Sequence, residues 1–223
     1  NGLASAEAVV TETEKELGVA VADIGAATID LTLVADGSPF HTAVLPVGGN
    51  NVTNDVAIGV KTTLQVAEEL KVRHGTCDLR AIEDEEISVS VLGEEAGRTV
   101  SRVELCQIIE SRMRETFELL RGEMARSGHG MLPAGIILTG GASLLAGTAE
   151  LGREVLQMPV RVTGAAGISG LVDTIQDPSY STAVGLLRWG AMQIAMGDPL
   201  HYESAPGGGG LSRIRRAFRS VFP

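Results

Sequence analysis

Val21-Ala-Asp-Ile-Gly-Ala-Ala-Thr-Ile-Asp30, continued by the alternating run to Gly37, is the stretch that decides the fold of this chain. Asp23 closes an apolar run that begins at Val19, and Gly25 follows where the chain must turn back. The pattern predicts a strand, a tight turn and a returning strand, with one carboxylate at the end of the first strand. Backbone amides in such a turn can form an anion site, and a nearby carboxylate can hold a hydrated magnesium ion.

Two explanations of this turn remain open when its residues are taken alone. The spacing D-x-G-x-x-T-x-D, from Asp23 to Asp30, suits a phosphate site, and it suits an ordinary hairpin equally well. A second glycine element at 138–143 lies between a strand pattern and a helix pattern, so its backbone can lie flat against a planar or anionic ligand. Glu68 and Lys71 share one helical face, and they become ligand contacts only if both glycine turns converge on them; otherwise they are a solvated pair.

Length and composition indicate a soluble globular protein. The 223 residues are 44% hydrophobic, and no run approaches the ~18 to 20 apolar residues of a membrane-spanning helix. The N-terminus lacks a secretory pattern, so we expect a cytoplasmic protein. A net charge of −10 argues against nucleic-acid binding. Cys77, Cys106 and the four histidines lack metal-ligand spacing, which argues against zinc.

The order of the predicted elements is that of an α/β protein. Three strands in succession, the third at 40–47, form a meander, and helices and strands alternate after it. Ser101 and Glu104 match a capping box at the start of a long helix. The remaining predictions are a short helix or connector at 4–17, helices at 50–60, 61–73, 146–157 and 181–196, and strands at 86–92, 135–139 and 160–162.

The last residues of the chain differ from the rest in charge. Residues 211–223 carry +4, whereas residues 1–210 carry −14. A helical projection gathers the apolar residues on one face and the arginines on the other: Leu211, Ile214, Phe218, Val221 and Phe222 against Arg213, Arg215, Arg216 and Arg219. Such a helix suits the boundary of an anionic bilayer. The alternative is a basic tail that is disordered or that packs on a partner.

Several segments together resemble the FtsA family of bacterial actin-like cell-division proteins. The resemblance covers nearly the whole chain and is carried by 4–18, 21–25, 41–49, 52–59 and 67–71. It implies an α/β fold, namely an actin-like ATPase (ribonuclease H-like) lobe with a smaller inserted α/β subdomain and a C-terminal amphipathic helix. The implied domains are a connector at 1–18, the second lobe at 19–197 with the smaller subdomain at roughly 60–130, a flexible linker at 198–210 and a membrane-targeting helix at 211–223.

The resemblance also implies which residues bind ATP and magnesium. Asp23 would hold the magnesium ion through water, and the turn that runs on to Asp30 would contact the β and γ phosphates through Gly25, Ala26, Ala27 and Thr28. Glu68 and Lys71 would flank the ribose and adenine, and Gly140, Gly141 and Ala142 would lie against the adenosine. The family usually has glycines where this chain has Ala26 and Ala27, and each added methyl group crowds the approach to phosphate. The first lobe is missing from the resemblance, so the expected nucleotide site is half a site.

The function implied by the resemblance is that of an adaptor with at most a weak ATPase activity. Such a protein binds ATP, polymerises, recruits FtsZ and other division proteins, and anchors them to the cytoplasmic face of the membrane at the division site. The C-terminal peptide of FtsZ would dock on the smaller subdomain, where Arg102, Arg112 and Arg114 are candidates to meet an acidic peptide. The alternatives are another actin-like protein of the PilM or MreB type, or a sugar kinase.

Overall fold

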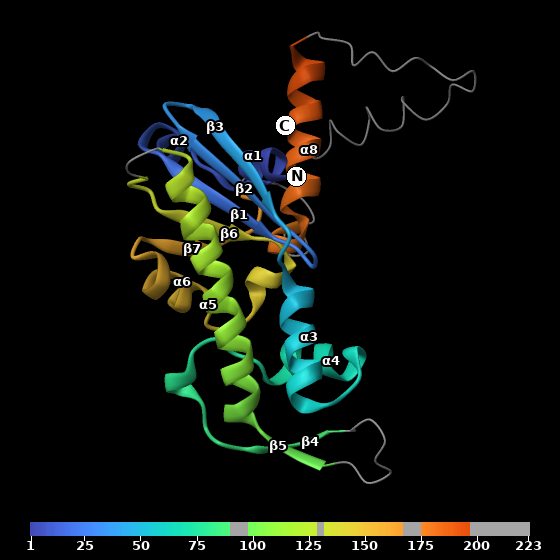
Figure 1. Cartoon of the computed structure of the whole chain (residues 1–223). Helices are drawn as coiled ribbons and strands as arrows, with labels where there is room; N and C mark the ends of the chain where they lie inside the picture. Colours follow the sequence, from blue (N-terminus) through green and yellow to red (C-terminus); the bar gives the residue numbers. More distant parts are fainter. Residues whose placement is uncertain (90–97, 129–131, 167–174, 197–223) are drawn as a thin grey trace, which may run out of the picture.

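The computed structural model describes residues 1–89, 98–128, 132–166 and 175–196, and its centre is a five-stranded mixed sheet (Figure 1). The strand order is β3-β2-β1-β6-β7. The first three strands form an antiparallel meander, and β6 and β7 continue the sheet in parallel with β1. The strands are β1 (Val19–Ile24), β2 (Ile29–Ala35), β3 (Ser38–Leu45), β6 (Ile136–Thr139) and β7 (Val160–Val162). The predicted meander and the α/β class are confirmed.

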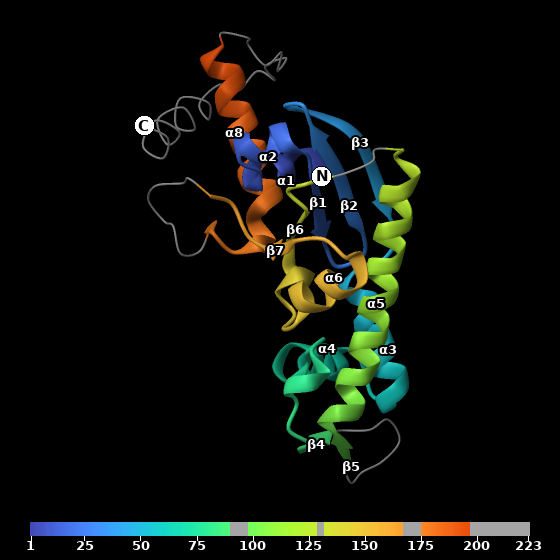
Figure 2. The ribbon, with the colours of Figure 1, turned by 90° about the vertical axis from the view of Figure 1, so that its left-hand side faces the viewer.

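Helices cover both faces of the sheet, as Figure 2 shows. One face packs against α1 (Gly2–Val9) and α8 (Ser181–Ala195), and the other against α5 (Arg102–Arg126) and α6 (Thr148–Leu156). The alternation of β1 explains the two cores, because Val19 and Val21 face α1 while Ala20, Ala22 and Ile24 face α5. Short α2 (Glu12–Leu17) lies beside β2.

A second group of elements lies at the end of the molecule away from the sheet, at the bottom of Figure 1. It contains α3 (Gly49–Val60), α4 (Leu64–His74), and the two-stranded sheet of β4 (Glu86–Val89) and β5 (Arg98–Ser101). The 25 residues of α5 run from this group to the sheet and contribute buried side chains along their whole length. Three short 3-10 helices complete the description: η1 (Leu79–Ala81), η2 (Gly141–Leu144) and η3 (Pro178–Tyr180).

Several boundaries differ from expectation by a few residues, β5 was not predicted from the sequence, and two departures have a clear local cause. The segment 4–17 contains two helices rather than one. Val10 is extended and ends α1, and Thr11 then caps the start of α2 through a capping box with Glu14. The helix predicted from Lys61 begins at Leu64, since Lys61 takes a left-handed conformation and Thr63 caps the next helix. The linker at 198–210, the tail at 211–223 and the end of the strand predicted at 86–92 lie outside the described residues. Within the described ranges, every helix is too short or too polar to cross a bilayer.

Candidate functional site

The turn between β1 and β2 is held by the start of α3. The amides of Gly49 and Asn50 donate to the carbonyl oxygens of Gly25 (2.9 Å) and Ala26 (2.7 Å). Gly48 permits this close approach, because a Cβ there would lie 2.6 Å from the carbonyl oxygen of Gly25. The predicted turn is therefore fixed on the N-terminal end of a 12-residue helix.

The outer side of the same turn remains open to a ligand. Ala26 and Ala27 are exposed, and their amides donate to no acceptor in the part of the chain that the structure describes. Unused amides beside the positive end of a helix macrodipole favour a bound anion. Because both alanines are exposed, their methyl groups add bulk on the open side of the turn.

Asp23 is held from the α1 face of the sheet by hydroxyl groups of two helices. Its Oδ2 accepts hydrogen bonds from Ser5 Oγ of α1 (2.5 Å) and Thr182 Oγ1 of α8 (2.7 Å). Its Oδ1 lies against Gly140, where a Cβ would come within 2.3 Å. Oδ1 accepts no hydrogen bond from the described residues, so one fixed carboxylate oxygen is left for the water shell of a magnesium ion, and the residue fits that role.

A cavity of about 470 Å³ lies beside the turn, between α3, α4 and η2. Residues from three separate predicted elements line it: Ala26 of the turn, Glu68 and Lys71 of α4, and Gly141 and Ala142 of η2. The approach is close, since a Cβ at Gly49 would lie 3.2 Å from Ala142 Cβ and 3.7 Å from Lys71 Nζ. The two glycine turns therefore do converge on the Glu68–Lys71 pair, which was the condition for its having a binding role.

Not every predicted site residue reaches this cavity. Asp30 pairs with Asp23 in the hairpin but lines a different hollow, of about 410 Å³, together with Gly2 and Thr32. Five further predicted residues do not line the cavity either, but they belong to the hairpin and the Gly-Gly turn, whose Ala26 and Gly141 do: Asp23, Gly25, Ala27, Thr28 and Gly140.

The cavity also contains apolar residues that sequence reasoning missed. Val72 and Leu144 line it and are 70% and 52% exposed, although both are large and apolar. Met113 and Leu145 add to the same wall. Open apolar side chains beside a few polar groups suit a flat aromatic ring. The sequence offers one weak signal for them: Val72 directly follows Lys71, and Leu144 follows the Gly-Gly turn.

The charged pair in the cavity is tightly connected. Lys71 Nζ lies 2.6 Å from Glu68 Oε2, and Thr53 Oγ1 donates a hydrogen bond to the same carboxylate oxygen. Burial acts to raise the pKa of Glu68, but the hydrogen bonds from Lys71 and Thr53 and the charge of Lys71 outweigh it and lower that pKa below its ordinary value. The Glu68 carboxylate is therefore ionised at neutral pH.

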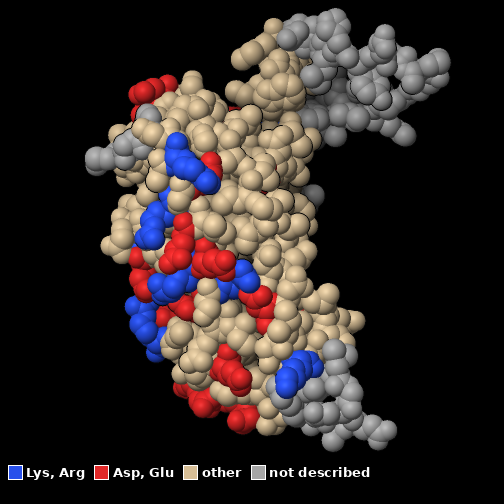
Figure 3. Space-filling view, viewed as in Figure 1, with Lys and Arg blue, Asp and Glu red and all other residues tan. Residues whose placement is uncertain are grey.

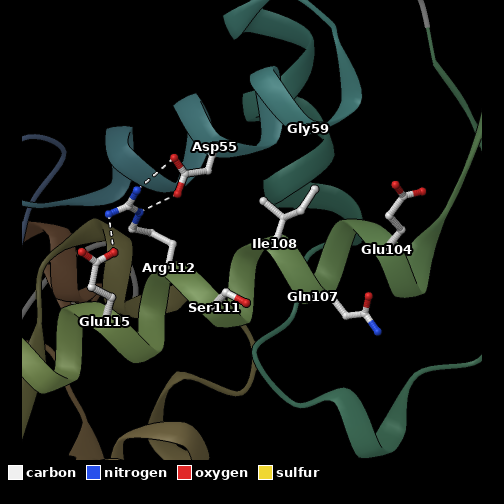
Figure 4. A pocket seen from close by; sticks show the side chains of 8 residues that line it. All are labelled: Asp55, Gly59, Glu104, Gln107, Ile108, Ser111, Arg112 and Glu115. Carbon is white, nitrogen blue, oxygen red and sulfur yellow. Dashed lines mark hydrogen bonds and ion pairs between the residues drawn. The ribbon is translucent and has the colours of Figure 1, made fainter.

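A further hollow, of about 520 Å³, lies between α3 and α5 (Figure 4). Arg112 crosses it and forms a bidentate pair with Asp55, with Nε–Oδ2 and Nη2–Oδ1 distances of 2.5 and 3.1 Å. The same guanidinium reaches Glu115 Oε2 at 2.5 Å. We call this hollow the α3–α5 groove, and its lining is Asp55, Gly59, Glu104, Gln107, Ile108, Ser111, Arg112 and Glu115.

The arginines of α5 are already paired within the molecule. Arg114 contacts Glu110 at 2.6 Å and Glu154 at 2.7 Å, and Arg102 donates to the carbonyl oxygen of His74. Figure 3 shows acidic and basic side chains interspersed across the middle of this face. An acidic peptide therefore has to compete with internal carboxylates for Arg112 and Arg114, which the sequence alone did not reveal.

The sheet order, the hairpin and the cavity beside the Gly-Gly turn define an actin-like fold, which solved structures share. MreB5 of Spiroplasma citri bound to ADP matches with a TM-score of 0.66 at 15% identity, covering 88% of this chain and 60% of that one. The MamK double helical filament matches with a TM-score of 0.63 at 18% identity, covering 85% and 58%. The PilM–PilN type IV pilus biogenesis complex matches with a TM-score of 0.61 at 22% identity, covering 83% and 49%. Identities this low establish the fold alone.

The chain belongs to the FtsA family, since the family model "Cell division protein FtsA" matches residues 20–185. Cell division protein FtsA of Pseudomonas aeruginosa is 40% identical over 99% of this chain and 55% of that protein. The protein of the same name from Escherichia coli K12 is 41% identical over 85% of this chain and 47% of that protein. The resemblance inferred from the sequence is confirmed, and the chain spans about half the length of the curated relatives it matches.

Proposed function

We propose that this chain supplies one wall of the ATP site of an FtsA-type adaptor in bacterial cell division. The observation that carries the proposal is the convergence of the hairpin turn, the Glu68–Lys71 pair and the Gly-Gly turn around one cavity. The support from fold neighbours is that MreB5 was solved with ADP and with AMPPNP. In this proposal residues 19–197 form one lobe of a larger protein, with a smaller subdomain at roughly 60–130.

Each part of the cavity suits one part of a nucleotide. The adenine would lie between the open apolar side chains of Val72 and Leu144 and against the backbone at Gly141. The phosphates would lie at the amides of Ala26 and Ala27, beyond the N-terminal end of α3. Asp23 Oδ1 would hold the water shell of magnesium, which when bound neutralises phosphate charge.

Partner binding is proposed for the α3–α5 groove. The FtsZ C-terminal peptide would place an apolar side chain on Ile108, which lines the groove, and would hydrogen-bond to Gln107 or Ser111. A peptide carboxylate would bind Arg112 only in exchange for Asp55 or Glu115. The lobe would also take part in filaments, a proposal supported by its fold likeness to the MamK filament.

Membrane attachment is proposed for the tail at 211–223, which lies outside the described residues. Its apolar face would enter the boundary of an anionic bilayer, and its four arginines would remain among the lipid headgroups. The complete adaptor would then lie on the cytoplasmic face of the membrane at the division site, with no nucleic-acid partner.

ATP binding by the full-length protein tests the proposal, with Ala142→Phe as the decisive variant. The new ring would fill the cavity beside Gly49, so we expect at least about a tenfold loss of ATP affinity by calorimetry, the effect of about 1.4 kcal/mol. Leu119→Phe places the same ring on an exposed position of α5 outside the cavity and should leave the affinity unchanged. Unaltered ATP affinity in the Ala142→Phe protein would count against this cavity as the nucleotide site.

A further inference from the structure

Thr53 joins the two helices that form the walls of the cavity, although it is absent from the lining itself. It belongs to α3, and its side chain is 6% exposed. Its Oγ1 lies 2.9 Å from Lys71 Nζ, donates to Glu68 Oε2, and lies 3.1 Å from the carbonyl oxygen of Gly49. One hydroxyl therefore connects the helix that starts on the phosphate turn with the charged pair of α4.

The protons available on Lys71 and Thr53 decide which of these contacts are hydrogen bonds. The Lys71 ammonium has three protons and three acceptors: Glu68 Oε2 (2.6 Å), Thr53 Oγ1 (2.9 Å) and the Gly49 carbonyl oxygen (3.3 Å). The Thr53 hydroxyl has one proton, which goes to the carboxylate because an ionised acceptor forms the stronger bond. All three N–H donors of Lys71 are therefore used in hydrogen bonds within the protein.

The same count leaves one acceptor unused. Glu68 Oε2 receives hydrogen bonds from both Thr53 and Lys71, whereas Glu68 Oε1 receives none from the residues that the structure describes. Glu68 lines the cavity. A carboxylate held by one oxygen, with its other oxygen unused beside a cavity, is a fixed acceptor for a hydroxyl group of a ligand.

We propose that Thr53 is a positioning residue: with Lys71 as a strut, it holds Glu68 so that Oε1 accepts a hydrogen bond from a ribose hydroxyl of the nucleotide. The inference rests on the proposed ATP site and on the place beside the ribose that the family resemblance implies for Glu68; what it adds is the role of Thr53. It gives Lys71, which the family resemblance implies beside the ribose and adenine, the additional role of holding Glu68. It also implies selectivity, because a nucleotide that lacks this hydroxyl leaves a fixed carboxylate oxygen without a partner.

The affinities of the full-length protein for ATP, 2′-deoxy-ATP and 3′-deoxy-ATP test this role. We expect the wild-type protein to bind ATP at least about tenfold more tightly than one of the two deoxy analogues. Thr53→Val removes the hydroxyl at nearly constant volume, and it should weaken ATP about tenfold and reduce the discrimination to within about twofold. Thr53→Ser keeps the hydroxyl and should retain the wild-type pattern.

The control is Thr116→Val, at a buried threonine of α5 whose hydroxyl donates only to the carbonyl of Arg112 in its own helix. It should change stability but not the preference among the three nucleotides. A Thr53→Val protein that keeps wild-type ATP affinity and discrimination overturns the positioning role while the ATP site stands. The inference also fails if the wild-type protein binds both deoxy analogues as tightly as ATP. Absence of ATP binding in the wild-type protein overturns both the ATP site and the inference. If Thr53→Val does not fold, Thr53→Ala removes the same hydroxyl group without introducing a branched side chain.

Discussion

Gly140 brings the Gly-Gly turn directly against the end of β1. Its φ of +83° is in the region that favours glycine, and a Cβ would lie 2.3 Å from Asp23 Oδ1 and 2.6 Å from the Ile24 carbonyl oxygen. Gly140→Ala should therefore lower the free energy of unfolding by about 2 to 4 kcal/mol in urea titration. Gly141→Ala is the matched control, because its Cβ would meet only Ser179 at 3.8 Å. Equal stability of the two variants would contradict this account.

The cysteines give a second prediction at the residue scale. Burial raises the pKa of the Cys77 thiol to about 12, and burial likewise raises the pKa of Cys106. Because the thiolate is the reactive form, neither cysteine should react with iodoacetamide at pH 8 in the folded protein. Both should be alkylated in guanidinium chloride, as counted by mass spectrometry. Rapid labelling of Cys77 in the native protein would contradict this prediction and show that the buried surroundings of Cys77 open to solvent.

Among the secondary-structure elements, α2 and the edge strand β7 are joined by Glu14. Glu14 Oε2 accepts from the amide of Thr11 (2.9 Å), and Glu14 Oε1 accepts from Arg161 Nη2 (2.8 Å). Burial acts to raise the pKa of Glu14, but the hydrogen bonds from Thr11 and Arg161 outweigh it and lower that pKa below its ordinary value. One carboxylate thus caps a helix and ties it to the far edge of the sheet.

Glu14→Gln should cost about 1 to 2 kcal/mol of unfolding free energy at pH 7. A carboxyl group with a lowered folded-state pKa stabilises the fold above its unfolded pKa, near 4.5, and this contribution is lost as the pH falls through the folded-state value. The difference between wild type and variant should therefore shrink below about pH 4.5 in denaturant titrations. Glu12→Gln removes an 87% exposed partner of Lys15 and should cost less than about 0.5 kcal/mol. A pH-independent difference for Glu14→Gln would contradict the ionic part of the argument.

At the scale of the whole molecule, the tail at 211–223 is proposed to attach the protein to the membrane. Replacing Phe218 and Phe222 with Glu should abolish sedimentation of the full-length protein with anionic vesicles, because it puts charge on the apolar face. Ser212→Glu with Ser220→Glu makes the same change in charge on the polar face, so it should weaken binding without abolishing it. Retained sedimentation of the double Phe variant would rule out the tail as the anchor.

Much of the architecture could be predicted from the sequence, and the reason is local periodicity. Strand alternation around Asp23 and the 3.6-residue period of the helix that begins at Arg102 are properties of short windows, and they predicted the meander and the long helix. The Glu68–Lys71 pair was recognised from its helical spacing, its binding role was implied by the family resemblance, and both residues were then found in the lining of the cavity. Val72, Leu144 and Thr53 were not predicted, because a single apolar or hydroxyl side chain has no local pattern that marks it as part of a site.

What the sequence determined by itself is the hairpin at Asp23, the α/β class, the family and the amphipathic pattern of the tail. Only the tertiary structure decided that three distant segments share one cavity, that Arg112 is already paired with Asp55, and that Thr53 donates a hydrogen bond to Glu68. The physical reason is the distance along the chain between the residues whose contacts decide each feature. Secondary structure follows from contacts a few residues apart, whereas a binding site and the partner of a charge follow from how elements far apart in the chain pack together.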